Sequence, residues 1–180
     1  MSATVRQAIK ALKIRVSDVQ DKMEDASASL ALRDARDNDA DNAVMSLSLE
    51  LLSVVNSNRA DKRYKNIFLK KPSEITTQPI TDELSDLELL AERLKADTAD
   101  TVYQKHQPLI KNARTALQNA QETIDSANTA EQNSAALETI AQNELRTLLT
   151  KTYGKLIDIL NKKEGEKYFN IQAGKPKSPV

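Results

Sequence analysis

The chain has no cysteine and no tryptophan, and its 180 residues include only three glycines, five prolines, two phenylalanines and four tyrosines. Without cysteine, disulfides, thiolate catalysis and cysteine-based zinc sites are excluded. Neither a Walker loop nor a GxGxxG motif, the glycine-rich loops that bind phosphates, occurs among the three glycines. So few glycines and prolines also leave little material for the turns of a β fold. The composition therefore points to helices whose core is filled by Ala, Leu, Val and Ile.

Long apolar runs are also missing. No run of 18 apolar residues occurs, and the opening MSATVRQAIK has no apolar stretch of the kind found in signal peptides. We therefore expect no membrane span and a cytoplasmic location. The 26 basic and 26 acidic side chains balance, so no net charge attracts the whole chain to nucleic acid or anionic lipid.

Catalytic groups are scarce as well. His106 is the only histidine, whereas ferritin-like di-metal bundles need a Glu-x-x-His motif on each of two helices. It lies beside Pro108 near an expected helix break, where we predict a surface position. No set of convergent acid, base and nucleophile is visible. We therefore expect neither an enzyme nor a cofactor.

Apolar residues recur in steps of four and three, which is the pattern of amphipathic helices packed side by side. The first such run consists of Val5, Ile9, Leu12, Val16, Val19, Met23, Ala26 and Leu30. Further runs begin near Ala40, after Thr81 and near Leu137. Residues 70–80 are predicted as a loop and residues 126–134 as a turn.

These segments predict an all-α protein, an antiparallel four-helix bundle of long helices. The bundle would form a single domain over residues 1–165, followed by a flexible tail over 166–180. The alternative is an elongated three-helix coiled coil in which residues 3–66 form one helix. The two folds differ in whether the chain bends between residues 33 and 42.

The stretch RDARDNDADNAV, residues 33–44, decides between them. The heptad register passes through it unbroken, which favours one helix. Six of the nine residues 34–42 are Asp or Asn, however, and each costs about 0.5–0.7 kcal/mol relative to Ala inside a helix. Asp37 or Asn38 would also be a good N-cap. We therefore predict a break near residues 36–39.

The aspartates of this stretch are candidate metal ligands. Asp37, Asp39 and Asp41 occupy positions one, three and five of an EF-hand loop, where carboxylate oxygens bind calcium. Position six is Asn42 instead of glycine, and position twelve is Ser48 instead of a bidentate glutamate. Calcium binding is therefore a hypothesis set beside the simpler interpretation, a solvated polar turn.

A basic segment follows at residues 59–71, with six bases against Asp61 alone. Interleaved bases and aromatic rings are typical of surfaces that bind phosphates and stack bases. The same segment could instead dock on acidic faces of this protein or of a second copy, since residues 18–50 carry nine acids and three bases. The candidate binding residues are Arg59, Lys62, Arg63, Tyr64, Lys65, Lys70 and Lys71.

Together these patterns predict a non-enzymatic helical-bundle protein that acts through protein–protein interaction or self-assembly, as a scaffold, adaptor or chaperone-like protein. We expect a protein partner or a homo-oligomer. One alternative is a binder of nucleic acid or another anionic partner through residues 59–71. The other is a calcium-responsive helical protein that uses residues 34–41.

Overall fold

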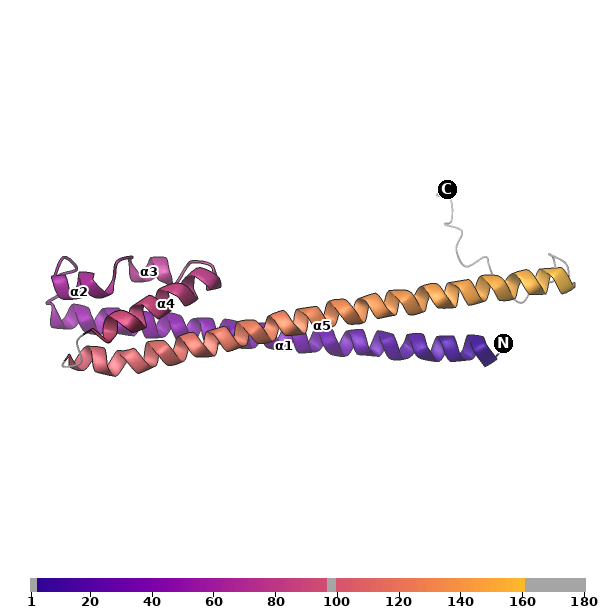
Figure 1. Cartoon of the computed structure of the whole chain (residues 1–180), viewed down its shortest axis with the longest axis horizontal. Coiled ribbons are helices and arrows are strands. Elements are labelled where there is room, and N and C mark those ends of the chain that lie inside the picture. Colours follow the sequence, from indigo (N-terminus) through magenta and orange to yellow (C-terminus); the bar gives the residue numbers. More distant parts are fainter. Residues whose placement is uncertain (1–2, 97–99, 161–180) are drawn as a thin grey trace, which may run out of the picture. The chain divides into compact units, whose positions relative to one another are not determined.

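The computed structural model describes residues 3–96 and 100–160. These residues form the helices α1 (Ala3–Val54), α2 (Lys62–Ile67), α3 (Pro72–Ile75), α4 (Ile80–Leu94) and α5 (Thr101–Leu160), and they contain no strand (Figure 1). The prediction of an all-α helical bundle is confirmed. The predicted tail over 166–180 lies outside the described residues.

Contacts divide the chain into two compact units. Among the described residues, unit 1 comprises 3–23 and 130–160, and unit 2 comprises 24–96 and 100–129. Each unit therefore contains a part of α1 and a part of α5, while α2, α3 and α4 belong to unit 2.

Unit 2 contains the hydrophobic core. The core residues of α1 follow one another at intervals of four and three residues, and their side chains are fully buried. The α2–α3 region closes the core with Tyr64, Ile67, Phe68 and Ile75. The main members from α1, α4 and α5 are Ala40, Val44, Leu47, Leu51, Leu87, Leu90, Ala91, Leu94, Val102, Tyr103, Ile110 and Leu117.

Unit 1 is a pair of helical segments, residues 3–23 of α1 and 130–160 of α5. The hydroxyl of Ser134 donates a hydrogen bond to the carboxylate of Asp18, and both Ser134 and Val5 are buried. The apolar face is only partly covered, because two helices cannot enclose a core. Val16 on this face consequently stays about half exposed, and Ile14 and Ile140, on other faces of the two helices, are also about half exposed.

The predicted break near residues 36–39 is wrong, because α1 runs through this stretch without interruption. Ala40 and Val44 bury their side chains completely on the core face. The polar side chains on the outer face satisfy each other, since Arg36 pairs with Asp39 at 2.8 Å and the amide of Asn38 donates to the Asp34 carbonyl at 2.8 Å. Burial on one face thus outweighs the poor helix propensity of the other.

The predicted turn at 126–134 is wrong for a similar reason, because α5 continues through it. Ser126 and Thr129 donate their hydroxyl protons to carbonyls one turn earlier, at 2.8 and 2.9 Å. These side chains therefore bond within the helix and do not compete with it.

The long helix α1 ends well before residue 66, the limit of the predicted alternative. Asn56 and Ser57 adopt positive φ angles of 50° and 62°, and the Ser57 N–H donates to the Leu52 carbonyl at 2.7 Å. This left-handed pair stops the helix and reverses the chain towards α2. Among the helices of residues 3–96 and 100–160, none is long and apolar enough to cross a membrane.

Candidate functional site

The short helix α2 organises the basic segment. The Asp61 carboxylate caps its start by accepting the Arg63 N–H at 2.7 Å, and the Phe68 N–H donates to the Tyr64 carbonyl at its end. Tyr64 and Phe68 contact each other with ring centroids 5.1 Å apart. The Tyr64 hydroxyl lies 2.9 Å from the buried hydroxyl of Ser48 on α1. These contacts fix α2 on the core, and its polar side chains point away on two sides.

On one side lies a hollow of about 470 Å³, which we call the basic groove. Its floor is apolar, and Leu69 beside it is 71% exposed. Its rim carries four cations. The lining residues are Arg59, Tyr64, Lys65, Phe68, Leu69, Lys70, Lys71 and Pro72.

Two of the four cations at the rim are already neutralised. Lys70 pairs with Asp86 of α4 at 2.7 Å, and Lys71 pairs with Glu74 at 3.2 Å. Burial acts to raise the pKa of Asp86, but hydrogen bonds from Lys70 and Gln78 outweigh it and hold that pKa below its usual value. Arg59 and Lys65 form no ion pair with any residue that the structure describes. The groove therefore combines uncompensated positive charge with an apolar floor.

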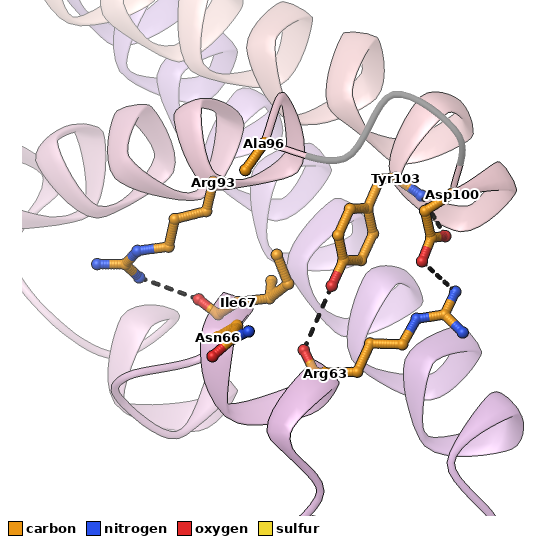
Figure 2. A pocket seen from close by; sticks show the side chains of 7 residues that line it. All are labelled: Arg63, Asn66, Ile67, Arg93, Ala96, Asp100 and Tyr103. Carbon is orange, nitrogen blue, oxygen red and sulfur yellow. Dashed lines mark hydrogen bonds and ion pairs between the residues drawn. The ribbon is translucent and has the colours of Figure 1, made fainter.

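On the other side of α2 lies a hollow of about 680 Å³, lined by Arg63, Asn66, Ile67, Arg93, Ala96, Asp100 and Tyr103 (Figure 2). Arg63 forms an ion pair with Asp100 and lies over the Tyr103 ring, 5.7 Å from its centroid. Arg93 points the other way and donates to the Ile67 carbonyl at 3.0 Å (Figure 2). The two arginines thus lie at opposite ends of the hollow and point away from each other, so they do not converge on one ligand.

The structure therefore separates the predicted anion-binding residues. Arg59, Tyr64, Lys65, Lys70 and Lys71 line the basic groove. Arg63 faces the second hollow, where Asp100 neutralises it, and Lys62 is exposed and lines neither. The sequence contains no signal for this separation, because Asp100 lies 37 residues beyond Arg63.

The predicted metal ligands are also separated. Asp37 and Asp41 lie one turn apart on the face of α1 that meets Glu83 of α4, whereas Asp39 is exposed and pairs with Arg36. An EF-hand loop needs a bent chain to bring positions one, three and five together, and here these positions belong to a helix. In the part of the chain that the structure describes, no group of three or more histidine, aspartate or glutamate residues is arranged to hold a metal ion.

Glu83, Asp37 and Asp41 form a carboxyl cluster that sequence reasoning missed. Glu83 is 1% exposed, and its Oε1 has no hydrogen-bond partner within residues 3–96 and 100–160, as is also true of the buried Oδ1 of Asp41. Burial first, then a hydrogen bond with Asp37 and the charges of Asp37 and Asp41, raise the pKa of Glu83 to about 8. Burial and the charge of Asp37 likewise raise the pKa of Asp41. At neutral pH Glu83 is therefore protonated and donates to Asp37.

His106 does not lie at the surface, as the sequence predicted, but is completely buried. Its Nε2 lies 2.8 Å from Oε2 of Glu50, and its Nδ1 has no partner among the described residues. Pro108, two residues later, is accommodated inside α5. The histidine therefore joins α5 to α1 as part of the core.

Comparison of the chain with protein-family models, with curated proteins and with solved structures finds no match. Any functional proposal therefore depends on the geometry of the basic groove and of the carboxyl cluster.

Proposed function

We propose that the chain is a non-enzymatic, self-assembling protein whose basic groove docks the acidic face of α1 in a second copy. The observation that supports this most directly is the uncompensated charge of Arg59 and Lys65 beside an apolar floor. Such a groove fits an acidic helix that presents one large apolar side chain.

The α1 helix is acidic and presents an exposed apolar side chain. Residues 18–50 carry nine acids against three bases. On the part of α1 in unit 2, Leu32 is 43% exposed, and Asp25 and Asp39 lie seven residues before and after it on the same exposed face. Asp39 is paired with Arg36, so docking would exchange this exposed ion pair for one with the groove. A chain whose charges balance overall but are segregated along its length is complementary to its own copy.

The same observations favour a protein partner over nucleic acid. Tyr64 and Phe68 are buried in the core of unit 2, so their faces are not free to stack on bases. Nucleic acid binding through residues 59–71 and a calcium response through residues 34–41 thus remain less supported alternatives.

A groove that binds a different surface of the next copy makes a heterologous contact, which generates rings or open chains. The average mass should then rise with protein concentration and fall as salt screens the ion pairs. Light scattering on the full chain at low and high salt measures both. A mass of 20.0 kDa, the mass of one chain, at every concentration and salt level would contradict self-assembly.

Charge reversal locates the contact. The double variant Arg59→Glu/Lys65→Glu should stay monomeric at low salt, whereas Lys151→Glu/Lys155→Glu, which reverses two exposed bases in unit 1, should assemble as the original chain does. Asp25→Lys/Asp39→Lys should also be monomeric, and mixing it with Arg59→Glu/Lys65→Glu should restore association. Assembly that survives the first variant would exclude the groove. The nucleic acid alternative would be favoured by a different result. The original chain would then bind a single-stranded oligonucleotide without self-assembling, and Arg59→Glu/Lys65→Glu would lose that binding.

A further inference from the structure

The carboxyl cluster is chemically unusual, because three acids meet and no base among the described residues pairs with them. Glu83 is 1% exposed, and neither its Oε1 nor the Oδ1 of Asp41 has a hydrogen-bond partner in that part of the chain. On α1 the groups that face Glu83 are Asp37 and Asp41. From α5, Arg114 reaches this part of α4, but it is bonded to the Leu84 carbonyl at 3.3 Å and to Glu88 at 3.0 Å. On α4 itself, Asp86 is held by Lys70 and Gln78. The nearby cations are therefore engaged with other acceptors.

A buried carboxylate without a compensating charge is strongly destabilising, and a buried, protonated carboxyl that donates a hydrogen bond is not. Glu83 is in the first turn of α4 and contacts the middle of α1, so its protonation state determines whether the two helices attract or repel at this point. One proton shared between Glu83 and Asp37 converts a repulsive contact into a hydrogen bond.

We propose that Glu83, Asp37 and Asp41 form a proton-dependent switch that holds α4 on α1 when the cluster is protonated and releases it when the proton is lost. The consequence extends to the basic groove, because α4 carries Asp86, which pairs with Lys70, and Arg93, which holds the Ile67 carbonyl. Alkaline conditions therefore loosen the support of α2 and α3. This inference does not depend on the proposed self-assembly.

The direction in which stability changes with pH follows from the raised pKa of Glu83. A carboxyl whose pKa is higher in the folded state than the ordinary 4.5 contributes stability that is fully present at low pH. That contribution is lost as the pH rises towards about 8, the pKa of folded Glu83. The urea midpoint of the full chain should then fall by about 1 M between mildly acidic and mildly alkaline pH.

Glu83→Gln tests the switch, because glutamine keeps an N–H donor for Asp37 but carries no titratable proton. Its urea midpoint should be nearly independent of pH over this range and exceed that of the original chain at alkaline pH. Glu92→Gln, an exposed change on the same helix, should keep the original pH dependence. The protection factors of the α4 amides, which correct for the rise of intrinsic exchange with pH, should fall at alkaline pH in the original chain and not in Glu83→Gln.

Asp41→Asn provides a second test that does not require Glu83→Gln to fold. Removing this charge lowers the pKa of Glu83, so the loss of stability with pH should become smaller. An unchanged pH dependence in either Glu83→Gln or Asp41→Asn would overturn the proposal. A urea midpoint that calcium chloride raises relative to EDTA, and that Asp41→Asn makes insensitive to calcium, would also overturn it, because the cluster would then bind a cation.

Discussion

The imidazole Nε2 of His106 lies 2.8 Å from the carboxylate Oε2 of Glu50, and Lys105 bonds to the same oxygen. This contact joins α5 to α1 within unit 2. Hydrogen bonds from Lys105 and then from His106 lower the pKa of Glu50 below its ordinary value of 4.5. A lowered pKa in the folded state means that folding favours the ionised carboxylate.

Glu50 should therefore contribute to stability at neutral pH and lose this contribution as the pH falls below about 4.5. Glu50→Gln should lower the urea midpoint at neutral pH and reduce the further loss in acid, as measured by the helical circular dichroism signal. Glu122→Gln, which alters an exposed carboxylate of α5, is the matched control. An acid profile of Glu50→Gln identical to that of the original chain would show that the contact has no influence on stability.

The alternation of buried and exposed residues on α1 gives a second prediction. Leu47 is completely buried in the core of unit 2, and Leu49, two residues later, is 64% exposed. Leu47→Ala should lower the free energy of unfolding by about 3 kcal/mol, because it leaves a cavity. Leu49→Ala should change it by less than about 0.5 kcal/mol. Similar costs for the two variants, measured by urea unfolding, would contradict the orientation of α1.

The continuity of α1 through the Asp-rich stretch at residues 33–44 gives a third prediction. Asn42 is exposed in the middle of the helix, so Asn42→Ala should raise the free energy of unfolding by about 0.5 kcal/mol through helix propensity alone. In a turn, or at a helix start, the same change would remove a favourable side chain and cost about 1 kcal/mol. The sign of the change therefore distinguishes a continuous helix from a bend.

The helical class could be predicted because apolar spacing is a local property of the sequence. The unbroken register from Leu30 to Val44 was the better guide in residues 33–44, and intrinsic propensity was the poorer one. Propensity describes an isolated helix, whereas Ala40 and Val44 are fixed by packing against the core of unit 2. The sequence pattern alone did not show how much this packing outweighs the local cost.

The parts of the sites that could not be predicted depend on partners far away in the sequence. The basic segment was recognised from its composition, and five of its seven candidates line one groove. The carboxyl cluster was missed because Glu83 lies more than 40 residues beyond Asp41 and acids are normally solvated. His106 was placed at the surface for the same reason, since its partner Glu50 lies 56 residues away.

The floor of the basic groove gives a final prediction. The hydroxyls of Tyr64 and Ser48 lie 2.9 Å apart and are buried, so neither has water as an alternative partner. Tyr64→Phe and Ser48→Ala should each lower the free energy of unfolding by about 1 kcal/mol. Each variant removes one of the two hydroxyls and leaves the other buried without a hydrogen-bond partner.

The double variant should cost clearly less than the sum of the two, with a coupling energy of about 1 kcal/mol in a double-mutant cycle. Additive costs would show that the two hydroxyls do not interact. Tyr64→Phe keeps the ring and all four bases of the groove, so its self-association at low salt should match that of the original chain. This separates the structural role of the Tyr64 hydroxyl from the proposed docking role of the surface above it.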